Sequence, residues 1–288
     1  MTQWTVNEPV KLTFDDPLGA LRVRVVNGAV NVIGTEDDGT PARLEVSALH
    51  GPPLLVTLED RTLTVTYEDL TWAGLKGWLK RGARNRSAVV TVTVPAGTDV
   101  QVGTVAATAT VSGLRGRTEV QGVSGDTTLA RLSGPVRAET VSGALEAQAV
   151  TGDLRFRSVS GDLTVVDGSG AAVRADSVSG DLAVDVEPAG GPTDIQVTSV
   201  SGEVAIRLPH RADAHVEANT TSGSVSNAFE GLRVGGMWGA KQITGTLGAG
   251  TGTLKATTVS GAIALLRRPE DADAPAAAST DAASGKAL

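Results

Sequence analysis

Residues Ser158–Val184 have the sequence SVSGDLTVVDGSGAAVRADSVSGDLAV, in which the phrase Val-Ser-Gly-Asp-Leu occurs twice, nineteen residues apart. Repetition at a nearly fixed period indicates a repeat architecture, in which each unit stacks on its neighbours. Related (V/T)-(S/T)-G phrases recur at steps of 18, 18, 19, 22, 21, 22 and 16 residues, with glycines at Gly125, Gly143, Gly161, Gly180, Gly202, Gly223, Gly245 and Gly261. Half-step glycines at Gly134, Gly152 and Gly170 divide several repeats in two. Each repeat is therefore predicted to hold two short strands and two turns.

The segments between these glycines alternate apolar and polar residues, as in Asp162–Val165 and Asp181–Val184. A period of two is typical of β-strands and not of helices. Strands this short bury little on their own, so we expect identical rungs to stack about 4.8 Å apart and share one aliphatic core. The sequence predicts an all-β fold, a parallel β-solenoid with two strands per rung of 18 to 22 residues. Right-handed winding is expected, because parallel crossovers are nearly always right-handed.

The repeated phrase predicts a role for each of its residues in the stack. We expect the valines to form an inward aliphatic column, comprising Val123, Val141, Val159, Val178, Val200 and Val259. We expect the serines to form a hydroxyl ladder that satisfies turn backbone groups, comprising Ser124, Ser142, Ser160, Ser179, Ser201, Ser222 and Ser260. Glycine takes the bend, because it tolerates positive φ. These roles are structural, so no catalytic residue is predicted in the phrase.

The chain is predicted to form one domain with a tail. Residues 1–100 alternate less regularly, with turn signals such as Asn27-Gly28 and Asp38-Gly39, and are expected to start and cap the solenoid. Residues 101–267 hold the regular repeats and continue the same domain. Residues 268–288 are rich in Ala, Asp, Ser and Pro with little to bury, which predicts a disordered tail.

Composition excludes several classes of function. The net charge of −7 and the pI near 5.1 give no basic footprint for a phosphate backbone, so nucleic acid is not an expected partner. The absence of cysteine excludes disulfides, thiol nucleophiles and thiolate metal sites. We see no signal peptide at the start and no apolar run of about 18 residues, the length that a membrane-spanning helix needs. The expected location is the cytoplasm.

One segment breaks the β pattern. LTWAGLKGWLKRGARNR, residues 70–86, places apolar side chains at roughly helical spacing among five cations. Tryptophan beside Lys and Arg is typical of a helix that lies on an anionic membrane surface. The alternative is a capping helix or loop that covers an end or edge of the solenoid. The candidate contact residues are Trp72, Leu75, Lys76, Trp78, Leu79, Lys80, Arg81, Arg84 and Arg86.

Other features carry less chemistry. The acidic residues after the turn glycines, Asp126, Asp153, Asp162, Asp181 and Glu203, are expected to be solvated and partly balanced by Arg137, Arg155, Arg157 and Arg174. Solenoids that bind calcium have a denser Gly-Asp pattern than this chain, so no calcium site is predicted here.

His210 and His215 lie five residues apart, which on a strand places them on opposite faces, so no zinc site is predicted. TGTLGAGTGTLKA from Thr244 is not a phosphate-binding loop, because Lys255 follows leucine. No cofactor is predicted.

The closing stretch FEGLRVGGMWGAKQITGTLGAGTGTLKATTVSGAIALLR, residues 229–267, and the recurring VSGD(L/V) phrase resemble a known family. It is a bacterial domain-of-unknown-function family of "putative adhesins" built from β-strand repeats. The resemblance covers roughly residues 18–267. It implies a β-solenoid without an established catalytic site, in a family of which some members are associated with cell-envelope stress systems or carry membrane anchors.

These observations predict a non-catalytic scaffold or interaction protein, in which the segment at residues 70–86 is able to meet a protein partner or an anionic membrane surface. Two alternatives stay open. Parallel β-helices host carbohydrate-active enzymes, although such sites need convergent carboxylates or basic groups with aromatic platforms. Solenoid ends with exposed strand edges can also stack on one another, which would give filaments.

Overall fold

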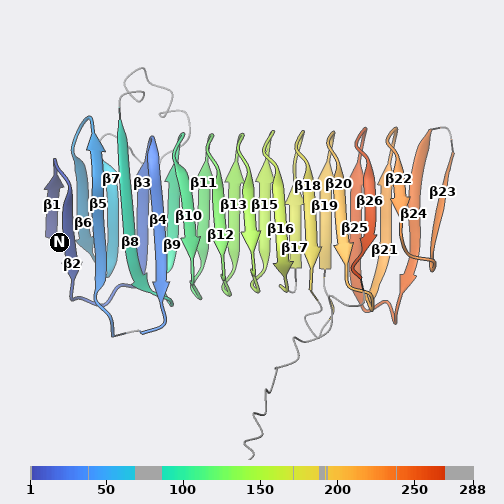
Figure 1. The fold of residues 1–288 in the computed structure, drawn as a ribbon, viewed down its shortest axis with the longest axis horizontal. Coiled ribbons are helices and arrows are strands. Elements are labelled where there is room, and N and C mark those ends of the chain that lie inside the picture. The colour runs from blue at the N-terminus through green and yellow to red at the C-terminus, as the bar shows by residue number, and fades with distance from the viewer. Residues whose placement is uncertain are drawn as a thin grey trace, which may run out of the picture.

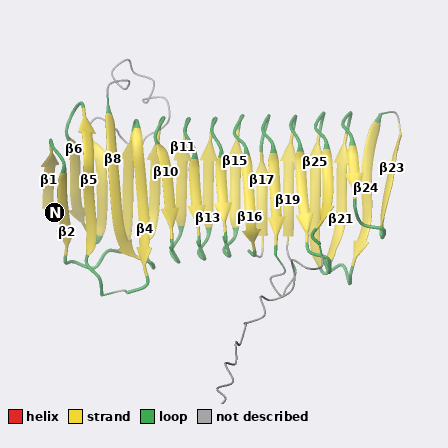
Figure 2. Ribbon diagram, viewed as in Figure 1, coloured by secondary structure: helices red, strands yellow, loops and turns green. Residues whose placement is uncertain are grey.

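The computed structural model describes residues 2–37, 39–68, 86–170, 172–187, 192, 194–237 and 239–269. All the regular elements described are β-strands, and they form two sheets that face each other along an extended rod (Figures 1 and 2). No helix in the described ranges is long and apolar enough to cross a bilayer.

The 14-stranded sheet contains, in spatial order, β1 (Thr2–Val6), β6 (Leu54–Glu59), β7 (Thr62–Tyr67), β3 (Ala20–Val25), β9 (Asp99–Thr104), β11 (Thr118–Gly122), β13 (Val136–Thr140), β15 (Leu154–Ser158), β17 (Ala172–Asp176), β19 (Asp194–Ser199), β25 (Gly252–Thr258), β21 (Ala214–Thr220), β24 (Ala240–Leu247) and β23 (Leu232–Met237). The 12-stranded sheet contains β2 (Val10–Phe14), β5 (Ala42–His50), β8 (Ser87–Pro95), β4 (Gly28–Thr35), β10 (Thr108–Ser112), β12 (Thr127–Ala130), β14 (Leu145–Gln148), β16 (Leu163–Gly168), β18 (Leu182–Val186), β20 (Val204–Leu208), β26 (Ile263–Arg267) and β22 (Val225–Asn227).

The middle of the rod is the predicted parallel β-solenoid. From β9 to β20 the chain alternates between the two sheets, and each strand pairs in parallel with the strand two positions later. The register matches equivalent repeat positions, so that Leu145 pairs with Leu163 and Leu163 with Leu182. Two strands per rung are confirmed.

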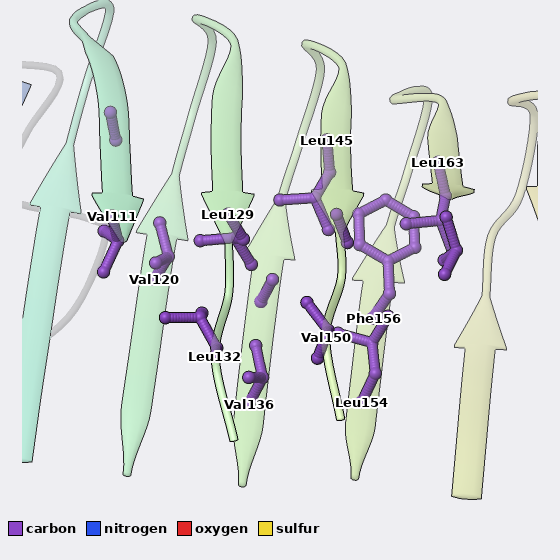
Figure 3. Close-up of a cluster of buried hydrophobic side chains, with 14 of the residues drawn as sticks. Val111, Val120, Leu129, Leu132, Val136, Leu145, Val150, Leu154, Phe156 and Leu163 are labelled. Atoms are coloured by element: carbon purple, nitrogen blue, oxygen red, sulfur yellow. The ribbon is translucent and has the colours of Figure 1, made fainter. Parts of the chain in front are cut away.

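The core lies between the sheets and consists of the inward residues of each strand. Figure 3 shows part of it, where Leu129, Leu145 and Leu163 of one sheet lie across from Val120 and Phe156 of the other. All five are at most 3% exposed. Period-two alternation produces this core, because every second side chain of a strand points to the same face.

The valines of the VSG phrase do not belong to this core, and the prediction of an inward column is wrong. Val141, Val159, Val178, Val200 and Val259 are 37%, 51%, 48%, 47% and 49% exposed, and Val123 is half-buried. The alternation of the preceding strand continues into the turn, so the hydroxyl residue before the valine points inward instead. Thr140 donates a hydrogen bond of 2.9 Å to the Ser142 carbonyl, and Ser199 donates one of 2.8 Å to the Ser201 carbonyl.

The serine ladder is confirmed. The N–H and the Oγ of each serine both donate to one acceptor, the carbonyl of the valine in the preceding rung. In Ser160, for example, the N–H bond to the Val141 carbonyl is 2.8 Å and the Oγ bond is 3.2 Å. The Oγ bonds are 3.1 to 3.4 Å long for Ser124, Ser142, Ser160, Ser179, Ser201, Ser222 and Ser260.

The chain order is not sequential at either end of the rod. The last rung in sequence, β25 and β26, lies between the rung of β19 and β20 and the rung of β21 and β22. Gly245, counted above as a turn glycine, therefore lies within β24 and pairs with Val216 and Leu232 in antiparallel ladders. At the other end β7 and β8 precede β3 and β4, and antiparallel strands β6, β1, β5 and β2 follow beyond them.

The predicted start of the tail at residue 268 is wrong. Arg268 is 6% exposed, and its N–H donates to the Leu208 carbonyl at 2.9 Å, so this residue belongs to the folded rod. Residues 270–288 lie outside the described residues.

Turn glycines with positive φ should be sensitive to substitution. Gly143 has a φ of +113°, and a Cβ there would lie 2.5 Å from the carbonyl oxygen of Gly125 in the preceding rung. We expect Gly143→Ala to lower the free energy of unfolding by about 2 kcal/mol or more. Gly97→Ala is the control, because nothing lies within 4 Å of a Cβ at that turn position. Urea unfolding of both variants measures the difference, and equal stabilities would contradict the account.

Candidate interaction edge

The predicted contact segment falls mostly outside the described residues. Trp72, Leu75, Lys76, Trp78, Leu79, Lys80, Arg81 and Arg84 lie there, and Arg86 is described. The Arg86 guanidinium carbon lies 5.5 Å from the centre of the Tyr67 ring, and the Asn27 side chain donates a 2.8 Å hydrogen bond to the Arg86 carbonyl. Tyr67 is fully buried, so the end of the segment at Arg86 is tied to the rod.

The segment interrupts a rung at a place where neighbouring rungs turn tightly. It joins Tyr67 at the end of β7 to Ser87 at the start of β8, whereas the next rung passes from β3 to β4 through Val26 and Asn27. Asn27 belongs to this adjacent turn and also accepts the Ala88 N–H at 2.9 Å. The segment therefore begins and ends at the edge of the rod that carries the VSG turns, which we call the turn edge.

The turn edge also carries the exposed valines, which together we call the valine ridge: Val123, Val141, Val159, Val178, Val200 and Val259. Backbone bonds link neighbouring turns throughout, for example from Ser179 to Val159 and from Ser201 to Val178. The valines therefore repeat at the strand spacing of about 4.8 Å. Partly exposed apolar side chains in one continuous row are a feature of interaction surfaces.

Carboxylates flank the ridge on the side of the 12-stranded sheet. Each lies in the turn and accepts a backbone N–H from the next rung: Asp126 from Ala144 at 3.0 Å, Asp162 from Asp181 at 2.9 Å, and Asp181 from Glu203 at 2.7 Å. The aspartates therefore join the rungs and leave a row of negative charge beside the valines. Within the described ranges, no group of three or more His, Cys, Asp or Glu side chains is arranged to hold a metal ion.

Residues 21–266 match the sequence model of the family Toastrack DUF4097. The chain belongs to the Toastrack DUF4097 family. None of the curated proteins compared with the chain matches it.

Two solved structures are similar to this Toastrack chain. One is a "putative cell adhesion protein" from Clostridium sporogenes, with 10% sequence identity and a TM-score of 0.27, and the match covers 91% of this chain and 100% of that chain. The other is a "putative adhesin" from Parabacteroides merdae, with 10% identity and a TM-score of 0.25, covering 91% of this chain and 97% of that chain.

The arginines expected to balance the turn carboxylates lie elsewhere on this Toastrack rod. Arg137, Arg155 and Arg174 stack in register on the outer face of the 14-stranded sheet. Arg137 contacts Glu139 at 2.5 Å, and Arg157 lies 3.8 Å from Asp176. The prediction that they balance the acidic column is therefore wrong, because strand alternation directs them to the sheet face and the column lies in the turns.

The two histidines do not share a strand, and the Gly-rich stretch spans two strands and a turn. His210 lies in the turn after β20, next to the Arg267 guanidinium, and His215 is exposed on β21 with its Nδ1 3.4 Å from the Thr246 hydroxyl. The stretch from Thr244 forms the end of β24, a turn and the start of β25. Gly248 and Gly250 in that turn have φ values of +59° and +74°.

A buried charge cluster was not predicted from the sequence. Asp185 on β18 accepts hydrogen bonds from Arg207 and, at 2.8 Å, from Arg268, which also bonds Glu187 at 3.3 Å. Burial alone would raise the pKa of Asp185, but the hydrogen bonds from the two arginines outweigh burial and hold this pKa below its usual value. The cluster attaches the last residues of the fold to β18.

Asp185→Asn should destabilise the rod in a pH-dependent manner. At pH 7 we expect a loss of about 3 kcal/mol in the free energy of unfolding, because the buried Arg268 loses the nearest of its carboxylate partners and Arg207 loses its hydrogen bond. The folded-state pKa of Asp185 is lowered, so its contribution is present above the unfolded value of about 3.9 and disappears as pH falls through the folded value. Urea unfolding should therefore show the stabilities of the variant and the wild type converging as the pH falls below the unfolded value.

The matched control is Asp176→Asn, whose exposed carboxylate lies 3.8 Å from Arg157. We expect a loss below about 0.5 kcal/mol at pH 7. An Asp185→Asn effect as small as that of the control, or one that is unchanged in acid, would contradict the role assigned to the cluster.

Proposed function

We propose that this chain is a non-catalytic interaction scaffold and that its turn edge binds a protein partner. One observation carries the proposal: the repeated phrase exposes its valines in a single row on a rigid edge. If these valines served only to stabilise the fold, they would be buried, as the leucines of the strands are. The flanking carboxylates of Asp126, Asp162, Asp181 and Glu203 favour a partner that presents basic groups beside an apolar strip.

The alternative of a carbohydrate-active enzyme finds less support in the described residues. The turn carboxylates are engaged by backbone N–H groups, and Phe156 is buried in the core rather than presented to a sugar ring. A hollow of about 250 Å³ on the outer face of the 12-stranded sheet is lined mainly by aliphatic residues such as Val166, Ala205 and Leu266. Asp185 and Arg207 at its side bond each other. We therefore keep the non-catalytic proposal.

A membrane contact through residues 70–86 is the second candidate. It is supported by the composition of the segment and by its insertion into a rung at the turn edge, between Tyr67 and Ser87. The carboxylates beside the valine ridge would repel anionic lipid, so we limit this contact to the segment itself. The corresponding location is the cytoplasm, at the periphery of the membrane.

Charges placed on the valine ridge should prevent partner binding without unfolding the rod. The variant Val159→Asp, Val178→Asp, Val200→Asp replaces three side chains that are 51%, 48% and 47% exposed. Each protein is used as bait, and the captured proteins are quantified by mass spectrometry. The amount of at least one specific partner captured by the variant should be about tenfold or more below the amount captured by the wild type.

The control places three aspartates on exposed positions of the sheet faces, Thr110→Asp, Thr164→Asp and Gln196→Asp. It should retain the partner, and all three proteins should unfold at similar urea concentrations. Identical capture by the ridge variant and the wild type would contradict the proposal that the ridge binds a protein.

The membrane contact is tested by co-sedimentation with vesicles that contain anionic phospholipid. Wild type should bind, and the variant Trp72→Ala, Trp78→Ala, Lys80→Glu, Arg81→Glu should remain in the supernatant. Arg155→Glu, Arg174→Glu makes the same change in charge on the outer face of the 14-stranded sheet and should still bind. If none of the three proteins sediments with the vesicles, the proposal of a membrane contact is contradicted. The proposal that the valine ridge binds a protein does not depend on this result.

A further inference from the structure

The two ends of the rod are built differently. At the N-terminal end both sheets stop together, at β1 and β2, and the core is closed by an aromatic pair. The rings of Trp4 and Phe14 lie 5.3 Å apart, edge to face. Lys11 on the edge strand β2 contacts Glu45 at 3.1 Å, and a charged edge strand resists pairing with another chain.

At the C-terminal end the two sheets do not stop together. The 14-stranded sheet continues past β21 with β24 and β23, whereas the 12-stranded sheet stops at β22, which belongs to the same rung as β21 (Figure 1). The end of the rod therefore has a step. Ile243 on β24 is fully buried, but its cross-strand partner Val234 on β23, which points to the same inner face, is 56% exposed.

Both strands at the step have an unpaired side. In the described part of the chain, β23 pairs with β24 alone and β22 pairs with β26 alone. The free N–H and C=O groups of such edges can pair with another strand. The charged side chain of β23, Arg233, is displaced by one residue from Val234 and so lies on the outer face. The inner face of β23 carries Leu232, which is already buried, and presents Val234 and Gly236.

We propose that two copies of this chain join at their C-terminal ends, so that the protruding strands of each copy fill the step of the other. A two-fold axis parallel to the strands relates the copies. It places β23 of one copy beside β22 of its partner, and the 14-stranded sheet of each copy continues into the 12-stranded sheet of the other. Val234 is then covered from the opposite layer in both copies.

The strand directions fit this arrangement. Because β24 is antiparallel to both β21 and β23, β23 runs in the same direction as β21. The chain reverses in the turn from β21 to β22, so β22 runs opposite to both (Figure 1). Rotation about an axis parallel to the strands keeps their directions. The new pair of β22 and β23 is therefore antiparallel, and all its backbone groups can form a regular ladder.

The chain's own C-terminal segment is a less suitable occupant of the step. Its last buried residue, Arg268, is bonded through its guanidinium to Asp185 and Glu187 near the end of β18, two rungs in front of β26. The area also fits a second copy. Two protruding faces of about 10 Å by 20 Å, which are already partly covered at Leu232 and Ile243, and the four strand edges give an interface of at most roughly 1,000 Å². That is near the lower limit for specific association, so we expect a weak dimer.

Sedimentation equilibrium tests the association. Wild type should approach a dimer as its concentration rises to about 1 mM and should not grow further, because a two-fold contact closes on itself. Val234→Asp should weaken the dimer at least about tenfold, while Val159→Asp, with a similarly exposed valine on the turn edge, should leave it unchanged. The proposal is overturned if wild type stays monomeric at all concentrations, or if it forms species larger than a dimer. It is also overturned if Val234→Asp dimerises as strongly as wild type.

Crosslinking tests the arrangement, and the absence of natural cysteine makes it unambiguous. Ser226→Cys on β22 and Gly235→Cys on β23 are separate variants, and a Cβ at Gly235 meets nothing closer than 3.9 Å. With a short bis-maleimide, the mixture of the two variants should crosslink and neither variant alone should. Crosslinking of Gly235→Cys with itself would show β23 pairing with β23 and overturn the stepped arrangement. If the mixture of the two variants is dimeric but does not crosslink, the stepped arrangement is also overturned.

Discussion

The structure depends on one recurring interaction, the pair of hydrogen bonds that each turn serine donates to the valine carbonyl of the preceding rung. These bonds join neighbouring turns at the same residue in each rung that carries a turn serine, and so they keep the strands between them in register. They also fix which way the turn residues point. Hydroxyl residues before the valines face inward, where Thr140 and Ser199 bond the turn, while the valines that follow them face water. Register in the sheets and the apolar row on the turn edge thus have a common cause.

Much of the fold could be predicted from the sequence, because period-two alternation and glycine spacing are local signals. They give the strands, the rungs and the serine ladder. The direction of the valines could not be obtained by treating the phrase alone, since it depends on the strand residue before it, such as Ser158 or Thr140. The order of the end rungs could not be predicted either, because β25 and β26 insert in space between strands that come earlier in the sequence. The contact of Asp185 with Arg268 joins positions 83 residues apart, and no local pattern marks it.

The polar groups of the repeats are largely engaged in holding the rod together. Turn aspartates accept N–H groups from the next rung, serines donate to carbonyls, and the charged cluster at Asp185 attaches the end of the fold to β18. The proposed interaction surfaces are therefore apolar: the valine ridge on the turn edge and the step at the C-terminal end. A stepped dimer would leave the turn edge of both copies free, so self-association and partner binding are compatible.

Thiol reactivity measures directly whether the valines of the repeated phrase are exposed, because the sequence contains no cysteine. Val159→Cys, at a position 51% exposed, should react with a maleimide within about tenfold of its rate in denaturant. Val165→Cys, at a core position 2% exposed in the following strand, should be protected by roughly a thousandfold or more. Equal protection of the two thiols would contradict the account, because it would place the valines of the phrase in the core.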